Sequence, residues 1–102
     1  MSDSPKPQLG QIVKITRGRD NNKYAVIIGV LDSRFLLIAD GDKRKFDQPK
    51  KKNILHLQLQ DAISMEVVDS LKETGRVTNG KLRFAINKFA DSQQTEAQEK
   101  GD

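Results

Sequence analysis

Residues 10–31, GQIVKITRGRDNNKYAVIIGVL, decide how the first half of the chain folds. The stretch begins with QIVKI, in which apolar and polar residues alternate, and ends with YAVIIGVL, a continuous apolar run typical of a central strand buried on both faces. Between them, TRGRDNNKY (residues 16–24) concentrates three cations beside a glycine and two asparagines. Glycine and asparagine tolerate a left-handed backbone. The stretch therefore predicts two adjacent strands joined by a sharply turning, cationic loop.

Three further strand-like segments follow within the first sixty residues. RFLLIAD (34–40) comes after a tight connection at Asp32 and Ser33, and a short fourth segment is expected around Phe46. The fifth segment is the clearest, because Leu55, Leu57 and Leu59 alternate with polar residues. Five short strands separated by polar turns predict a small closed barrel, which removes exposed sheet edges.

Beyond residue 60 the spacing of apolar residues becomes helical. Ser64 can cap a first helix, and Gly75 can end it in the left-handed conformation. Either Thr78 or Asn79 can cap a second helix. One apolar stripe along this second helix is formed by Leu82, Ala85, Ile86, Phe89 and Ala90. We therefore expect a helical hairpin over residues 61–90, packed on a barrel over residues 9–60.

The totals describe one small domain with polar ends. The chain has 102 residues, of which 35% are hydrophobic and 31% charged, and it has no cysteine. Residues 1–8 and 91–102 lack apolar periodicity, so we expect a flexible N-terminal tail and a disordered C-terminal tail. The polar start has no signal-peptide pattern, and the longest apolar run is too short to span a bilayer. We expect a cytoplasmic protein that does not enter membranes.

Positive charge is concentrated in the first half of the chain. Residues 1–60 hold twelve Lys and Arg against six Asp, which gives 12 − 6 = +6, whereas residues 61–102 hold six against eight, which gives 6 − 8 = −2. A clustered charge raises the local concentration of an oppositely charged ligand. The asymmetry therefore favours a polyanionic partner for the N-terminal part.

Two cationic segments account for this charge. The loop over residues 16–24 carries Arg17, Arg19 and Lys23, while DKRKFDQPKKKN (residues 42–53) packs six cations into ten residues. Such charges repel one another, and neutralisation by phosphates releases counterions and strengthens binding. Two structural explanations stay open: the loop can be a solvated turn, and the lysine run can be a solubilising face or a guarded edge strand.

The order of these segments is similar to that of a known family. GQIVKITRGRDNNKYAVIIGVLDSRFLLIADG, followed by PKKKNILHL, resembles the KOW-domain RNA-binding proteins, akin to a class of eukaryotic and archaeal large-subunit ribosomal proteins. The resemblance covers residues 9–59 and extends loosely over residues 60–90. It implies an SH3-like barrel whose first inter-strand loop contacts RNA, and a cytoplasmic, ribosome-linked or RNA-linked role. In one departure, Asn22 stands where such proteins usually carry a second glycine.

The patterns of common enzyme and metal sites are incomplete. GRVTNGKL (75–82) satisfies the first seven positions of a phosphate-binding loop, but the eighth is Leu82 where Ser or Thr should hold magnesium. The DGD at 40–42 lacks the remaining ligands of a calcium loop. His56 has no second histidine or cysteine with which to build a catalytic or metal site. We therefore expect no enzymatic activity, no metal and no cofactor.

The sequence predicts a non-enzymatic protein that contacts structured RNA, plausibly ribosomal, through the basic loop and the lysine-rich segment. The aromatic residues are too few to form a stacking platform for single-stranded bases. The protein is expected to be a monomer when free, with ribosomal proteins as possible further partners. The alternative is an adaptor that uses the barrel and helical hairpin to dock an acidic protein. The predicted RNA-binding residues are Arg17, Gly18, Arg19, Asp20, Asn22, Lys23, Lys43, Arg44, Lys45, Lys50, Lys51 and Lys52.

Overall fold

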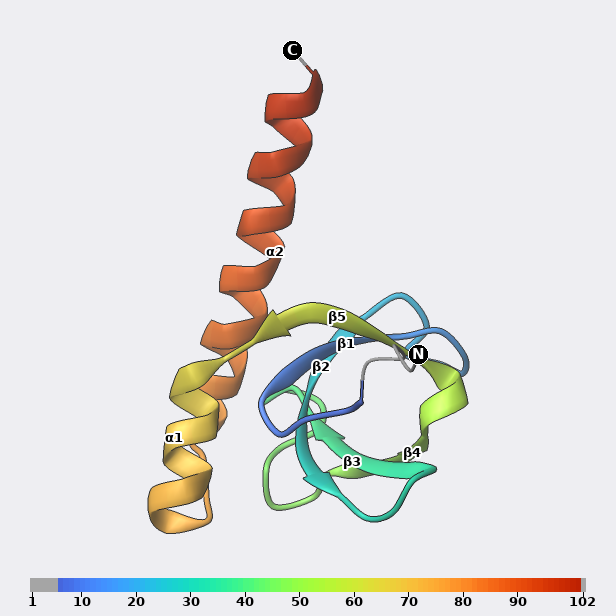
Figure 1. Cartoon of the computed structure of the whole chain (residues 1–102), viewed down its shortest axis with the longest axis vertical. Helices are drawn as coiled ribbons and strands as arrows, with labels where there is room; N and C mark the ends of the chain where they lie inside the picture. Colours follow the sequence, from blue (N-terminus) through green and yellow to red (C-terminus); the bar gives the residue numbers. More distant parts are fainter. Residues whose placement is uncertain (1–5, 102) are drawn as a thin grey trace.

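The computed structural model describes residues 6–101, and it describes their side chains as far as residue 93. Figure 1 shows a strongly curved sheet beside two helices, the second of which extends beyond the barrel. The predicted class, mainly β with α and a small barrel followed by a pair of helices, is confirmed. In chain order the elements are β1 (Gln11–Ile15), β2 (Tyr24–Val30), β3 (Phe35–Ala39), β4 (Lys50–Asn53), the 3-10 turn η1 (Ile54–His56), β5 (Leu57–Ile63), α1 (Met65–Thr74) and α2 (Asn79–Gly101).

The five strands form one antiparallel sheet in the order β4-β3-β2-β1-β5. Its register pairs Val13 with Ala25 and Ile38 with Lys50. The two strands at the ends of this order, β4 and β5, are joined directly by η1. The sheet therefore curls round on itself, and the single turn η1 links its two ends (Figure 1). Over the described residues β4 and β5 do not pair, so the barrel is not closed by strand pairing as expected and it keeps two edge strands.

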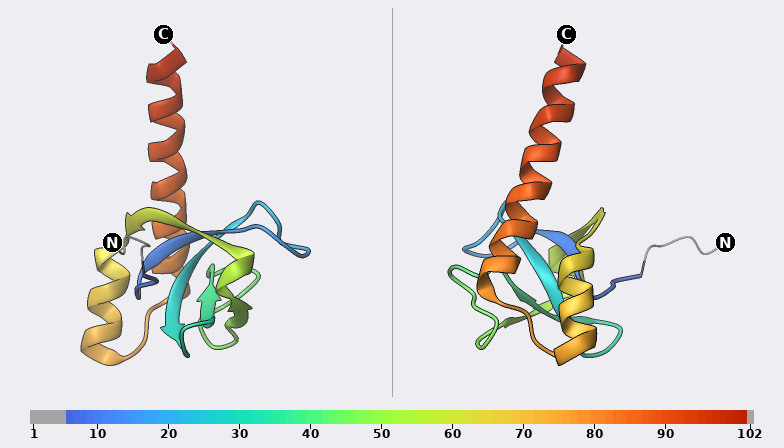
Figure 2. Two further views of the ribbon diagram at one scale, coloured as in Figure 1. Left: turned by 45° about the vertical axis from the view of Figure 1, so that its right-hand side comes forward. Right: turned by 90° about the vertical axis from the view of Figure 1, so that its left-hand side faces the viewer.

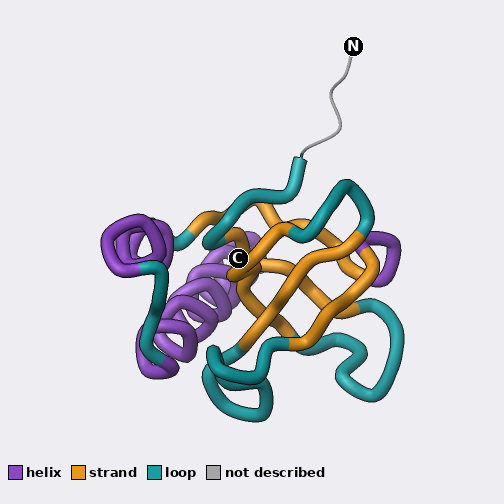
Figure 3. Tube along the Cα trace, turned by 90° about the horizontal axis from the view of Figure 1, so that it is seen from below, coloured by secondary structure: helices purple, strands orange, loops and turns teal. Residues whose placement is uncertain are grey.

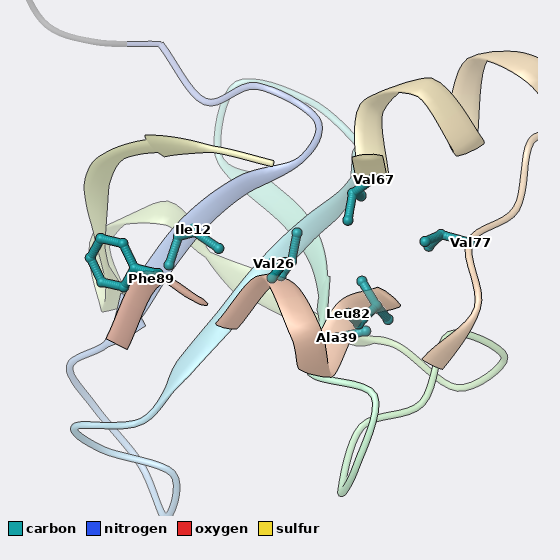
Figure 4. Close-up of a cluster of buried hydrophobic side chains, with 8 residues drawn as sticks. Ile12, Val26, Ala39, Val67, Val77, Leu82 and Phe89 are labelled. Carbon is teal, nitrogen blue, oxygen red and sulfur yellow. The ribbon is translucent and has the colours of Figure 1, made fainter. Parts of the chain in front are cut away.

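Both faces of the sheet are buried, each by its own cluster of apolar side chains. Successive residues of a strand contribute to the two clusters in turn, because they point to opposite sides. Ile12 faces the helices, whereas its neighbour Val13 faces the inside of the barrel. The barrel interior is filled by Val13, Ile15, Ala25, Ile27, Leu36, Ile38 and Leu57. The other core lies between the sheet and the helices (Figure 4), and it comprises Ile12, Val26, Ala39, Val67, Val77, Leu82, Ala85 and Phe89. The apolar run of β2 is continuous because its residues pack alternately into the two cores.

Both ends of α1 and the start of α2 have the chemistry expected from the sequence. The Ser64 hydroxyl accepts a hydrogen bond from the Val67 amide (3.3 Å), and Gly75 ends α1 with a left-handed backbone at φ 77°. At the start of α2, the Thr78 hydroxyl accepts from the Lys81 amide (3.2 Å), so Thr78 caps the helix and Asn79 does not. Both helices lie on one side of the strands, which Figure 3 shows from below.

Two details of the predicted strands are wrong. The fourth strand is the lysine run Lys50–Asn53, whereas Phe46 lies in the turn before it. A strand at the edge of a sheet accommodates lysines because one of its sides faces water. Leu55 is not in the fifth strand and is 80% exposed. The Asn53 side chain accepts a hydrogen bond from the Leu55 amide (2.8 Å), which starts η1 and delays β5 until Leu57.

The ends of the chain are only partly described. Residues 1–5 and 102 lie outside the described range, and α2 continues as a helix to Gly101. The flexibility expected for residues 1–8 and 91–102 therefore stays a prediction. Within residues 6–101, no helix has the length and apolar character that crossing a bilayer requires.

Candidate nucleic-acid interface

The loop between β1 and β2, residues 16–23, turns sharply through two left-handed residues. Gly18 has φ 98° and Asn22 has φ 72°, and Asn22 is the one non-glycine residue with positive φ among residues 6–101. The Asn22 amide donates to the Ile15 carbonyl (2.7 Å), and the Lys23 amide donates to the Asp20 carbonyl (3.0 Å). Asparagine adopts this conformation at modest cost. It therefore takes the place of glycine here, as the sequence indicates.

The cations of this loop point into solvent. Arg17, Arg19 and Lys23 are exposed, and Asp20 is half-buried. Over the part of the chain whose side chains are described, the one ion pair joins Arg76 to Asp47, away from this loop. Among the side chains described, no carboxylate lies within salt-bridge distance of these three positive charges. This arrangement leaves them available to an external anion.

The loop between β3 and β4, residues 40–49, is organised by an aspartate at its start. One carboxylate oxygen of Asp40 accepts hydrogen bonds from the amides of Asp42 (2.8 Å) and Arg44 (2.9 Å). The amides of Asp40 and Gly41 donate in return to the Arg44 carbonyl (2.9 and 3.0 Å). The DGD segment thus forms a turn, and this turn holds Lys43, Arg44 and Lys45 at the surface.

The two basic loops lie side by side although residues 24–39 separate them in the chain. In the right-hand view of Figure 2 both project from the same side of the barrel, the β1–β2 loop in blue and the β3–β4 loop in green. The Lys43 side chain contacts and repels that of Lys23, and this proximity lowers the pKa of Lys23 from its ordinary value, although the nearby carboxylates of Asp20 and Asp40 act in the opposite direction. A small hollow between the loops is lined by Ile15, Asp20, Lys23, Ala25, Ile38, Asp40, Arg44 and Lys50.

The lysines of β4 do not all join this face, because residues of a strand alternate between its two sides. Lys50 lines the hollow between the loops. The Lys52 ammonium donates a hydrogen bond to the Arg17 carbonyl (3.1 Å), which ties β4 to the β1–β2 loop. The Lys51 ammonium instead lies over the Phe35 ring, 4.6 Å from its centre. The structure therefore brings Lys50 and Lys52 to the two loops and sets Lys51 apart.

Known proteins are similar to this chain in sequence. A scan against models of known protein families finds no match. The Bacillus subtilis (strain 168) protein named "Putative ribosome-binding protein YbzG" is 46% identical over 71 residues, which cover 70% of this chain and 96% of that protein. The chain belongs to the YbzG family. Large ribosomal subunit protein eL14 of Sulfolobus acidocaldarius is 29% identical over 79 residues, covering 70% of this chain and 82% of that protein. The resemblance to KOW-domain proteins akin to large-subunit ribosomal proteins is thereby confirmed.

In this member of the YbzG family, the β3–β4 loop is held against the helices by residues that no sequence pattern indicates. Arg83 donates to the Gly41 carbonyl (2.6 Å), and the Phe46 amide donates to the Asn79 side chain (2.8 Å). Arg76 pairs with Asp47 (3.0 Å). Each pair is 29 to 42 residues apart in the chain, so no local pattern indicates it.

The segments that partly match enzyme or metal sites in the sequence have structural roles. Gly75 ends α1 and Thr78 starts α2, so the GRVTNGKL segment is a helix boundary. His56 is the last residue of η1, and its carbonyl accepts a hydrogen bond from the Thr16 amide (2.9 Å). Among the residues described, no three His, Asp or Glu side chains lie close enough together to hold a metal ion.

Proposed function

We propose that this protein is a non-enzymatic, ribosome-associated RNA-binding protein that contacts structured ribosomal RNA through one basic face. The face consists of the β1–β2 loop, the β3–β4 loop, and Lys50 and Lys52 of β4. One observation carries the proposal: the fold brings Lys23 beside Lys43 and gathers Lys23, Arg44 and Lys50 around one hollow. The Asp20 and Asp40 carboxylates lie near Lys23, but among the described side chains none of these cations forms an ion pair. The names of the YbzG and eL14 relatives, which mention the ribosome, support the choice of partner.

The electrostatics of the free protein favour a phosphate ligand. Two neighbouring ammonium groups repel each other, and a phosphate between them would replace this repulsion with attraction. Each phosphate that a cation neutralises also releases condensed counterions from the RNA. RNA binding should therefore raise the lowered pKa of Lys23. The affinity for RNA should fall steeply as salt is added.

The aromatic side chains support recognition of RNA shape and backbone over base stacking. The Tyr24 ring packs edge-on against Phe89, with 5.2 Å between ring centres. Lys51 covers the Phe35 ring, and the Arg76 guanidinium lies 5.2 Å from the centre of the Phe46 ring. Proteins that bind single strands present aromatic faces for bases to stack on. These four rings are already engaged, and the fifth, Phe84, is exposed beside the helices and outside the basic face, so a folded RNA read through its phosphates fits the face better.

The test is a filter-binding titration with deproteinised large-subunit ribosomal RNA at several salt concentrations. Replacing Arg17, Arg19 and Lys23 together by alanine should weaken binding severalfold or more. It should also flatten the salt dependence, since each lost phosphate contact lowers the slope by about 0.9. The matched control replaces Lys6, Lys72 and Lys88, three exposed lysines outside the two loops. Equal affinity and slope for both triple variants would rule out the loop as the contact.

A second candidate function, docking of an acidic protein partner, is favoured by an apolar hollow beside the helices. The hollow has a volume of about 350 Å³. On its rim Ile63, Met65 and Phe84 are 39%, 60% and 53% exposed. Exposed apolar side chains gathered in this way often mark protein contacts. Ribonuclease treatment during affinity purification separates the two functions, because an RNA-mediated association would be lost and a direct protein contact would survive.

We further propose that the free protein is a cytoplasmic monomer and that neighbouring ribosomal proteins are secondary partners. Sedimentation of the purified protein tests the first part. Co-sedimentation with ribosomes from a cell extract tests the second. Recovery in the membrane fraction alone would contradict this assignment.

A further inference from the structure

The segment that carries the cations of the β3–β4 loop is held at both of its ends. Gly41 stands just before Asp42, Lys43, Arg44 and Lys45, and Phe46 stands just after them. The Gly41 carbonyl accepts a hydrogen bond from Arg83 (2.6 Å), and the Phe46 amide donates to Asn79 (2.8 Å). Four residues, three of them cationic, therefore lie between two fixed points.

Both fixed points are provided by one face of α2. Asn79 and Arg83 are four residues apart, so their side chains lie one turn apart on the same side of the helix. The Asn79 side chain is available for this contact because Thr78 already caps the helix. Two adjacent residues at the start of α2 therefore have different roles: Thr78 caps the helix, and Asn79 holds the loop.

The contact between loop and helix is close. A Cβ atom added to Gly41 would collide with the Asn79 carbonyl oxygen and would also press on the Arg83 side chain. Gly41 is buried and has φ 80°, a conformation that other residues adopt only with strain. Only glycine lets the loop backbone lie this near to α2. The ion pair between Asp47 and Arg76 adds a third, more exposed link further along the loop.

We infer that Asn79 and Arg83 are positioning residues for the RNA-binding face, which act through Lys43 and Arg44 by fixing the loop before RNA arrives. The inference rests on the proposed function. A loop that is ordered in advance loses less conformational entropy when it binds, so affinity increases without any new contact. In this arrangement the helical pair is more than a cover for the sheet, because it sets the conformation of the basic face.

The decisive variant is Asn79→Ala, which changes no charge. Loss of the Phe46 hydrogen bond should weaken binding to deproteinised large-subunit ribosomal RNA by about threefold to tenfold, the effect of ordering one or two loop side chains. The slope of affinity against salt should stay the same, because the phosphate contacts are kept. Hydrogen exchange at the Phe46 amide should become faster. The control is Asn87→Ala, at an exposed position of the same helix, which should alter none of these.

A double-mutant cycle separates positioning from a general loss of structure. In a background with Lys43 and Arg44 replaced by alanine, the loop has lost the charges through which Asn79 is proposed to act. Asn79→Ala should then change RNA affinity by less than about 1.5-fold, because Asn79 is proposed to act on that affinity only through Lys43 and Arg44. An undiminished effect in that background would overturn the inference.

A second pair of variants covers the case in which Asn79→Ala does not fold. Arg83→Ala removes the hydrogen bond to Gly41 and should weaken binding, whereas Arg83→Lys keeps a charged donor and should restore most of the affinity. The inference is wrong, and the proposed function stands, if the wild-type protein binds RNA and a variant with faster hydrogen exchange at the Phe46 amide binds it equally well. If the wild-type protein does not bind ribosomal RNA at all, the proposed function fails and the inference fails with it.

Discussion

Gly41→Ala is the substitution from which the structure predicts the clearest change in stability. Gly41 lies at φ 80°, and the added Cβ would collide with the Asn79 carbonyl oxygen. The matched control is Gly75→Ala. Gly75 has nearly the same conformation, φ 77°, but apart from its two chain neighbours no residue has an atom within 4 Å of the added Cβ. The two variants share the strain of a left-handed alanine, and they differ in the contact between the β3–β4 loop and α2.

The expected loss of stability has two parts. A left-handed alanine costs about 1 kcal/mol, and Gly75→Ala should lose only this amount. At Gly41 the collision forces the loop away from α2 and breaks the hydrogen bond from Arg83. A hydrogen bond from a charged donor contributes about 2 kcal/mol. Gly41→Ala should therefore lower the free energy of unfolding by about 3 kcal/mol, a large share of the total for a small domain.

Urea unfolding followed by circular dichroism measures both variants against the wild type. The slope of unfolding free energy against urea should be unchanged, so the midpoint reports stability directly. In a thermal melt, 3 kcal/mol corresponds to a decrease of about 12 °C or more in Tm. If the two variants lose the same free energy to within about 0.5 kcal/mol, the loop is not packed on α2 as described, since additive local strain would then explain both.

Three further predictions concern single residues. Asn22→Gly should change the free energy of unfolding by less than about 0.5 kcal/mol, whereas Asn22→Val should lower it by about 1 to 2 kcal/mol, because valine resists the left-handed conformation; urea unfolding checks both. The amides of Arg34 and Phe35 donate to the Asp32 carboxylate and lower its pKa below the ordinary 3.8. The stability that this carboxylate contributes is present above its ordinary pKa and is lost as the pH falls through the lowered value. Asparagine does not titrate, so the free energy of unfolding of Asp32→Asn should fall less steeply than that of the wild type between about pH 5 and pH 2. Asp47→Asn should cost less than about 0.5 kcal/mol by the same assay, because the Arg76 and Asp47 side chains are 68% and 72% exposed.

The candidate site was partly predictable. The β1–β2 loop is local in sequence, so its cations and its left-handed Gly18 could be predicted from composition and spacing. Composition left Asn21 and Asn22 open as the second left-handed residue, and the resemblance to KOW-domain proteins pointed to Asn22. The lysine run was identified as cationic, but its division between two faces was not, because that depends on Lys50 pairing with Ile38 in the register of β4 on β3. The RNA contacts of all twelve predicted residues stay predictions.

Local patterns predict most of the elements: alternation of apolar residues predicts strands, a change of period predicts helices, and Ser64 and Gly75 mark the ends of α1. These features follow from interactions within a few residues. The choice of Thr78 over Asn79 as the cap of α2, the meeting of Lys23 with Lys43, and the hold of α2 on the loop at Gly41 and Phe46 are visible only in the folded chain. Those contacts arise because the curled sheet places two loops at the same rim and the apolar stripe of α2 docks beside them, and burial of apolar surface drives both arrangements.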